Sequence, residues 1–198
     1  MDTPRNDTHL LWTELDREVA LTTPVFSILR SRRKSADGRL ADYYILDSPD
    51  WANIVALASN NRGQTCFVMV RQYRHGSRQV SIEFPGGVVD PGEDPQTAVR
   101  RELREETGYS GEVIELLGSV NPNPALMGNR CYTYFCPAAD RIHADQDLDA
   151  NEIIDVELVP VEDLVHGRHS GSFDHAMMHV ALDFYLRLRG ANQMEKER

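Results

Sequence analysis

The stretch that decides the fold is GGVVDPGEDPQTAVRRELREETGY, residues 86–109. Its centre carries the signals of one short helix. Asp94 is a good N-cap, Pro95 suits the first helical position, and Gly108 suits a left-handed C-terminal cap. The pattern therefore predicts a helix from about Pro95 to Thr107.

One face of this helix is predicted to carry a row of carboxylates. Glu102, Glu105 and Glu106 stand at spacings of three and four, so their side chains share a face. Clustered carboxylates repel one another, and their hard oxygen atoms favour Mg²⁺ or Mn²⁺ over Zn²⁺ as a partner. The alternative is a solvated acidic face with ordinary ion pairs. The glycines ahead of the helix favour a site, because they permit a tight turn and close approach of the backbone to a ligand: Gly86, Gly87 and Gly92.

The spacing of these residues resembles a Nudix box. Gly87 is followed after five residues by Glu93, and after seven more by Arg101 and Glu102. The remaining positions of the motif are also occupied, by Leu103, Glu105, Glu106, Gly108 and Tyr109. The resemblance extends across nearly the whole chain and implies an α/β fold, the Nudix fold, in which a mixed β-sheet is sandwiched between α-helices.

The resemblance also assigns tasks within the box. It implies that Glu102 and Glu106 ligate Mg²⁺ or Mn²⁺ directly, that Glu105 is a third ligand or a catalytic group, and that the backbone carbonyl of Gly86 completes the coordination. Arg101 would hold the glutamates and Glu93 in place through bidentate hydrogen bonds. The alternative for Arg101 is a plain surface ion pair.

The general base is expected on a later loop. In similar enzymes a glutamate there removes the proton from water or ligates a metal, and the segment DLDANEIIDVELV offers Glu152, with Asp149 as a nearby substitute. Some relatives carry two glutamates in this loop, whereas this chain has Ala150. The division between ligand and base therefore stays open, as does the alternative of a solvated acidic loop.

Three further features resemble the subfamily of ADP-ribose pyrophosphatases and nucleoside diphosphate sugar hydrolases. They are the run QYRHG at 72–76, the run EFPGG at 83–87, and Pro124 fifteen residues beyond Tyr109. The resemblance implies that Arg74 binds a substrate phosphate or the terminal ribose, that Glu83 faces the same pocket, and that Pro124 belongs to the substrate site. The alternative for Arg74 is a surface arginine at a strand end.

The N-terminal region is expected to form a β-hairpin subdomain, residues 1–50. PVFSILRSRR and ADYYILDS read as two strands joined by a turn around Ser35 to Arg39. Both strands carry apolar residues on both faces, so they need a partner surface. The subfamily resemblance implies a homodimer, and the alternative is that the hairpin covers the main sheet of its own chain. Alternation predicts that either Tyr43 or Tyr44 points into a core.

Residues 51–198 are expected to form the Nudix hydrolase domain. Strands are predicted near 52–59, 65–74, 80–84, 113–117, 131–136 and 153–159, with a C-terminal helix from about Phe173 to Leu188. His175 and His179 stand one helical turn apart, but the apolar residues around them have helical spacing. Packing therefore explains this segment better than a metal site does.

Composition limits the partners. The 198 residues carry a net charge of −10, which would repel duplex nucleic acid. No apolar run is long enough for a signal peptide or a membrane span, and we expect a cytoplasmic protein. The three cysteines form no paired metal spacing, and we expect buried, reduced thiols: Cys66, Cys131 and Cys136.

The expected function is metal-dependent hydrolysis of the diphosphate bond of ADP-ribose or a related nucleoside diphosphate sugar, which yields a nucleoside monophosphate and a sugar phosphate. One alternative is a Nudix pyrophosphatase for another small molecule, such as GDP-mannose, a dinucleoside polyphosphate or a nucleoside triphosphate. The other is a catalytically silent, ligand-binding regulator, and the intact box argues against it.

Overall fold

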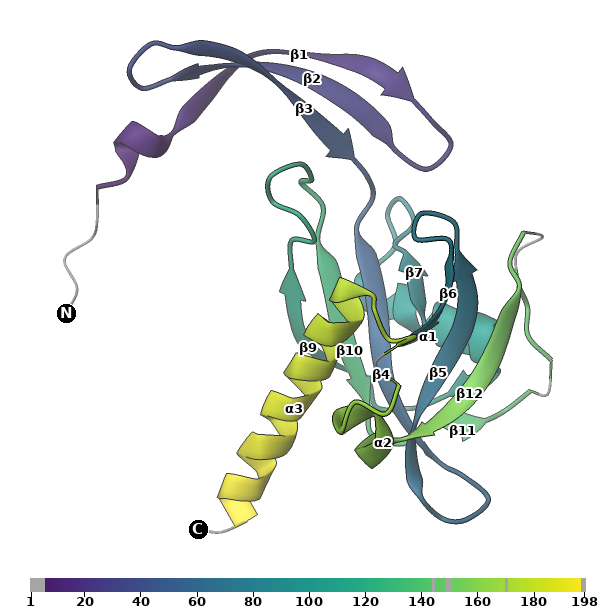
Figure 1. The fold of residues 1–198 in the computed structure, drawn as a ribbon. Helices are drawn as coiled ribbons and strands as arrows, with labels where there is room; N and C mark the ends of the chain where they lie inside the picture. The colour runs from purple at the N-terminus through teal and green to yellow at the C-terminus, as the bar shows by residue number, and fades with distance from the viewer. Residues whose placement is uncertain (1–5, 144, 149–150, 170, 197–198) are drawn as a thin grey trace. The chain divides into compact units, whose positions relative to one another are not determined.

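The computed structural model describes residues 6–143, 145–148, 151–169 and 171–196. The chain forms two compact units (Figure 1). The first contains the chain up to Pro49 together with the loop Asn121–Asn129. The second contains Asp50–Val120 and the chain from Arg130 onward. The sequence analysis did not anticipate that a loop from the middle of the chain groups with the N-terminal region.

The first unit is an antiparallel sheet of three strands in the order β1–β2–β3. After a short 3-10 turn, η1 (Thr8–Leu10), the strands are β1 (Trp12–Thr22), β2 (Ser27–Ser35) and β3 (Leu40–Asp47). The predicted hairpin corresponds to β2 and β3. The sheet contains a third strand, β1, which was not predicted. The sequence analysis missed β1 because ten of its eleven residues are exposed, which leaves no apolar alternation to detect.

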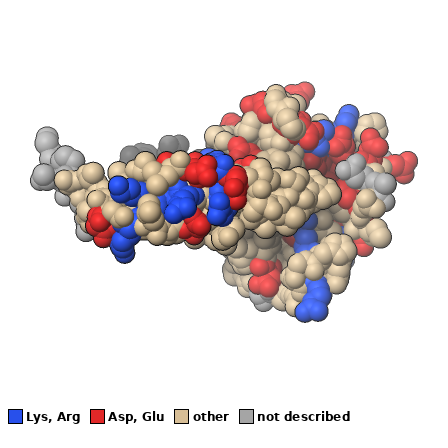
Figure 2. All heavy atoms as spheres, turned by 90° about the horizontal axis from the view of Figure 1, so that it is seen from above, with Lys and Arg blue, Asp and Glu red and all other residues tan. Residues whose placement is uncertain are grey.

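Charge pairing across the strands accounts for β1. Glu18 lies 2.9 Å from Arg30, and Glu14 lies 3.2 Å from Arg33, in each case across the β1–β2 ladder. Figure 2 shows basic and acidic side chains next to one another on the surface of the N-terminal sheet. The basic residues at positions 30, 32, 33 and 34 lie within β2.

Apolar side chains are nevertheless exposed on the N-terminal sheet. Tyr43 is 41% exposed and Tyr44 is 57% exposed, so the expectation that one of them points into a core was wrong. Tyr43 packs instead edge-on against Trp12, with ring centroids 5.4 Å apart. Further exposed apolar residues of this sheet are Leu15, Val19, Leu21 and Leu40.

The second unit is built on a mixed sheet of seven strands. The order is β12–β5–β4–β10–β9, with β6 paired to β5 and β7 paired to β4; β4 and β10 are parallel, and the other neighbours are antiparallel. The strands are β4 (Trp51–Ser59), β5 (Thr65–Arg74), β6 (Gln79–Glu83), β7 (Gly86–Val88), β9 (Glu115–Val120), β10 (Cys131–Cys136) and β12 (Ile154–Pro160). A separate two-stranded sheet pairs β8 (Tyr109–Ser110) with β11 (Asp140–Arg141).

Helices cover both faces of the seven-stranded sheet (Figure 1). They are α1 (Pro95–Thr107), α2 (Val161–Val165) and α3 (Ala176–Lys196). Alternation along β4 divides the core, because Ile54 packs with Leu103 of α1, whereas Val55 packs in the cluster that contains Tyr185 of α3. The predicted sheet between helices is confirmed. Among the described residues, no helix is long and apolar enough to cross a membrane.

The predicted α1 is confirmed at both ends. The Asp94 side chain accepts hydrogen bonds from the backbone N–H groups of Gln96 at 3.0 Å and Thr97 at 3.3 Å, and Gly108 adopts the left-handed conformation with φ of 71°. The C-terminal helix begins at Ala176, three residues later than predicted, because the apolar Phe173 belongs to the preceding turn and packs on the ring of Phe84. The three cysteines are buried and free, as predicted.

Candidate active site

The second unit contains an acidic cleft of about 880 Å³. Its walls come from α1, β4, the β5–β6 hairpin, the glycine turn ahead of α1, the segment ahead of β12 and the segment ahead of α3. Of the residues that the structure describes, two arginines line it, Arg74 and Arg101. Eight acidic residues of the described ranges also line it: Glu83, Asp90, Glu102, Glu105, Glu106, Asp147, Glu152 and Asp174. The cleft therefore holds a large excess of negative charge.

The glycine turn brings backbone against the helix. A Cβ atom at Gly86 would lie 2.2 Å from the carbonyl oxygen of Ala52, and one at Gly87 would lie 2.5 Å from Oε1 of Glu102. Neither position has room for a side chain, and the second contact would displace a carboxylate of the acidic row. Close packing therefore favours glycine at both positions, whereas the sequence analysis had expected close approach to a ligand and not to Ala52 and Glu102.

Glu106 is the most confined carboxylate of the row. It is 4% exposed, and its Oε2 accepts a hydrogen bond of 2.9 Å from the backbone N–H of Gly86. Burial raises the pKa of Glu106 to about 8, against the effect of that hydrogen bond and with the help of repulsion from Glu102 and Glu152. Burial likewise raises the pKa of Glu102, although Arg101 opposes the shift.

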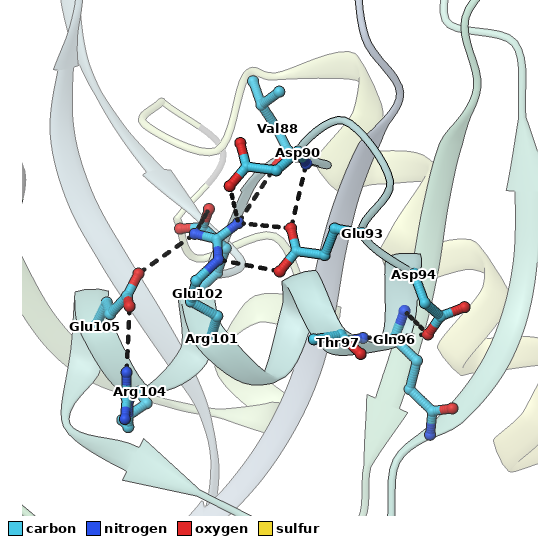
Figure 3. A network of polar contacts seen from close by, with 10 residues as sticks. All are labelled: Val88, Asp90, Glu93, Asp94, Gln96, Thr97, Arg101, Glu102, Arg104 and Glu105. Atoms are coloured by element: carbon cyan, nitrogen blue, oxygen red, sulfur yellow. Dashed lines mark hydrogen bonds and ion pairs between the residues drawn. The ribbon is translucent and has the colours of Figure 1, made fainter.

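Arg101 organises the other carboxylates (Figure 3). Its Nε and Nη2 donate to the two oxygens of Glu93 at 3.2 and 3.0 Å. Its Nη1 donates to Glu102 at 2.8 Å and to Glu105 at 3.3 Å, and its Nη2 also reaches the carbonyl of Val88 at 3.3 Å. The bidentate contact with Glu93 is the one that the sequence analysis predicted.

A second arginine is also held by a buried acid. Arg74 donates through Nε and Nη2 to the two oxygens of Glu83, both at 2.7 Å, and His175 Nδ1 lies 3.1 Å from Oε2 of Glu83. Glu83 is 1% exposed. Burial alone would raise the pKa of Glu83, but the hydrogen bonds from Arg74 and His175 prevail and lower it to about 2. The bidentate pair occupies two of the five N–H donors of Arg74, whose side chain is 45% exposed.

The remaining sequence candidates fall in different places. Glu152 lines the cleft, as predicted, and is close enough to Glu102 and Glu106 to raise the pKa of both. Asp149, its proposed substitute, lies outside the described residues. Pro124 lies in the loop that groups with the first unit.

The sequence analysis did not place Asp147 or His175 in the site, although both line the cleft. Asp147 follows an irregular acidic segment, and its backbone N–H bonds to the carbonyl of Glu105 at 2.9 Å, which only the folded loop brings about. His175 was assigned to helix packing, but it precedes α3 and faces the cleft.

The residues present suit a divalent cation. Among the described residues, no three His, Cys, Asp or Glu side chains converge as a ready-made metal cage. Mg²⁺, however, typically takes one or two carboxylates and fills its remaining positions with water and substrate phosphate. The all-oxygen donor set, the uncompensated Glu106 carboxylate and the glycine backbone held against Glu102 fit that chemistry.

The sequence that forms this cleft matches a known protein family. A family model described as NUDIX domain matches residues 50–179, which include β4, the glycine turn, α1 and the segment that carries Glu152. The matched range therefore contains every box residue named above.

Similar proteins were found at the levels of sequence and structure. The chain is 36% identical to a mouse ADP-sugar pyrophosphatase over 44% of this chain and 39% of that protein. It is 30% identical to the methanol dehydrogenase activator of Bacillus methanolicus over 78% of this chain and 81% of that protein. It is 27% identical to the ADP-ribose pyrophosphatase of Bacillus subtilis over 72% of this chain and 76% of that protein. A crystal structure of an ADP compounds hydrolase superposes with a TM-score of 0.77 at 17% identity, over 91% of this chain and 95% of that one, and shows that the fold is shared.

Proposed function

The chain belongs to the Nudix family of pyrophosphohydrolases, and from this premise we propose that it hydrolyses the diphosphate bond of ADP-ribose or a related nucleoside diphosphate sugar. The products would be a nucleoside monophosphate and a sugar phosphate. One observation carries the proposal: the uncompensated carboxylates of the box, Glu152 and the exposed guanidinium of Arg74 meet in a single cleft. Relatives named for ADP-ribose and ADP-sugars support this substrate class.

The acidic row would hold the cation. Glu102, Glu105 and Glu106, with the backbone carbonyl of Gly86, are the proposed ligands for Mg²⁺ or Mn²⁺. When bound, the cation neutralises charge on the diphosphate oxygens. Arg101 would act through the ligands, because its contacts with Glu102 and Glu105 hold their carboxylates in place.

Two other residues would act on the reactants. Glu152 is the proposed base, which takes a proton from the water that attacks phosphorus, while the bond from phosphorus to the bridging oxygen breaks and that oxygen leaves with the other phosphate. Arg74 is proposed to bind a phosphate oxygen of the substrate, since donors remain beyond its pair with Glu83. The Arg74–Glu83 pair fixes the guanidinium in advance, which reduces the entropy lost on binding.

We also propose that the N-terminal sheet, within residues 1–50, forms a homodimer. Its exposed apolar side chains support this, because a three-stranded sheet with such residues in water gains free energy from a covering surface. The candidates for burial include Leu15, Val19, Leu21, Tyr43 and Tyr44.

A panel of diphosphates tests the substrate class. The protein with Mg²⁺ is incubated with ADP-ribose, GDP-mannose, a dinucleoside polyphosphate and a nucleoside triphosphate, and specificity constants are compared. We expect the highest constant for ADP-ribose or another nucleoside diphosphate sugar. ADP-ribose should yield AMP and ribose 5-phosphate without inorganic phosphate. Direct release of inorganic phosphate, or binding of all four compounds without turnover, would contradict the proposal.

A further inference from the structure

The β5–β6 hairpin presents a polar face to the cleft. The antiparallel register pairs Gln72 with Ser81 and Arg74 with Gln79. Residues directly opposite each other, and every second residue along a strand, share a face of a sheet. Glu83, two residues beyond Ser81, continues the same face, and all five residues line the cleft. This polar face, defined by these five residues, offers amide, hydroxyl and guanidinium groups and no aromatic ring.

Buried Glu83 fixes the orientation of His175. Because its pKa is near 2, Glu83 is a carboxylate and only accepts hydrogen bonds, so Nδ1 of His175 must carry the proton that it donates at 3.1 Å. In the neutral ring Nε2 is then an acceptor, and it points away from Glu83 because the two ring nitrogens diverge. The side chain is 40% exposed and lines the cleft. A hydroxyl group in the cleft is the complementary donor.

Ser81 supplies a second group that needs a partner. The residue is 8% exposed, and its Oγ has no hydrogen-bond partner within the part of the chain that the structure describes. Buried polar groups are nearly always hydrogen-bonded, so an unpartnered hydroxyl on a cleft wall indicates a ligand that completes it. Ser81 lies on the same face of β6 as Glu83, the residue that anchors Arg74 and His175.

We propose that Ser81 and His175, together with Arg74, form a subsite for the sugar phosphate half of the substrate. The inference deepens the proposed hydrolysis and rests on it. Arg74 contacts the phosphate, while Ser81 Oγ and His175 Nε2 bind hydroxyl groups of the sugar. A nucleobase would gain from stacking on a ring, and the polar face provides none.

The experiment measures binding without catalysis. Ribose 5-phosphate and inorganic phosphate are titrated in the presence of EDTA into the wild type, S81A and H175N. Asparagine retains an N–H donor near the position of Nδ1 and removes Nε2, so H175N preserves the contact with Glu83. The matched controls are H179N, an exposed histidine of α3 that packs on Phe173, and S59A at the exposed end of β4. Thermal unfolding verifies that each variant is folded.

We expect S81A and H175N each to weaken binding of ribose 5-phosphate about three- to tenfold, the range for one lost hydrogen bond. Their affinity for inorganic phosphate should change by less than about twofold, as should both affinities in the control variants. Equal losses for the two ligands, no loss for either, or a wild type that binds ribose 5-phosphate no better than inorganic phosphate would overturn the subsite.

A parallel assay of ADP-ribose hydrolysis separates this inference from the proposed function. If the wild type hydrolyses ADP-ribose, but S81A and H175N bind ribose 5-phosphate as tightly as the wild type, the subsite is wrong and the proposed hydrolysis stands. Selective binding of ribose 5-phosphate without turnover of any diphosphate would overturn the proposed hydrolysis and leave a sugar phosphate site.

Discussion

Replacing Arg101 with lysine tests whether one guanidinium holds the acidic row in position. Arg101 makes five hydrogen bonds, to Glu93, Glu102, Glu105 and the carbonyl of Val88. Lysine keeps the charge but concentrates it in one ammonium group, which cannot form the bidentate contact with Glu93 and reach the helix face at the same time. About three of the five bonds should be lost.

The magnitude follows from burial. Glu93, Glu102 and Glu105 are 14 to 24% exposed, and Arg101 is 29% exposed, so solvent screens these pairs only in part. At about 0.5 to 1 kcal/mol for each lost bond, R101K should destabilise the fold by about 2 kcal/mol. The misplaced carboxylates should lower kcat about 10- to 100-fold with a smaller change in KM.

The matched control is R104K, the same substitution one turn along α1. Arg104 is 53% exposed and makes one side-chain contact, with Glu105 at 3.2 Å, so its replacement should cost at most about 0.5 kcal/mol and leave kcat within about twofold. Urea unfolding gives the stability, and steady-state kinetics on ADP-ribose give kcat and KM. If R101K behaves as R104K does in both measurements, Arg101 forms an ordinary surface pair and the positioning argument is wrong.

Four further predictions test other parts of the cleft and the first unit. E106Q should remain folded, as circular dichroism would show, while kcat falls by several orders of magnitude; near-normal turnover would remove Glu106 from the metal site. E152Q should lower kcat far more than substrate affinity if Glu152 is the base, and should also raise the Mg²⁺ concentration required if it is a ligand; no change in either would place the base elsewhere. The pKa of Glu83 falls from 4.5 to about 2 on folding, so its pairing should stabilise the wild type by up to about 3 kcal/mol above pH 4.5. That stabilisation should disappear as the pH falls from 4.5 towards 2, and urea unfolding of E83Q should lack this component of the pH dependence. Light scattering at micromolar concentration should give twice the chain mass of 22.4 kDa, and an active monomer would refute the dimer.

The features predicted best from the sequence depend on neighbouring residues. The α1 boundaries follow from the cap at Asp94 and the left-handed Gly108, which act within one helical turn. The contact between Arg101 and Glu93 spans only eight positions, and it was expected from the resemblance to the Nudix box. These features can be predicted from a short stretch of sequence, because they do not depend on how distant parts of the chain fold.

The features that the sequence analysis missed depend on contacts between residues far apart in the chain, or on a strand whose side chains are not buried. Glu83 and His175 are 92 positions apart, and only the packing of α3 against the sheet brings them together. Strand β1 has almost no buried residue, so its presence is determined by the ladder and ion pairs with β2. Neither arrangement leaves a periodic pattern in its own segment.

The cleft separates two kinds of buried carboxylate. Glu83 is compensated by Arg74 and His175, and its pKa is about 2, whereas Glu106 receives one backbone N–H among other carboxylates, and its pKa is about 8. The carboxylate of Glu83 is suited to a fixed position in a ligand-binding surface, because its charge is already balanced before a ligand binds. The second kind has no positive side chain to balance it. Because the bidentate contacts of both cleft arginines go to acids other than Glu106, its charge is balanced either by a proton or by a cation, and we propose that Mg²⁺ bound together with a diphosphate takes the place of that proton.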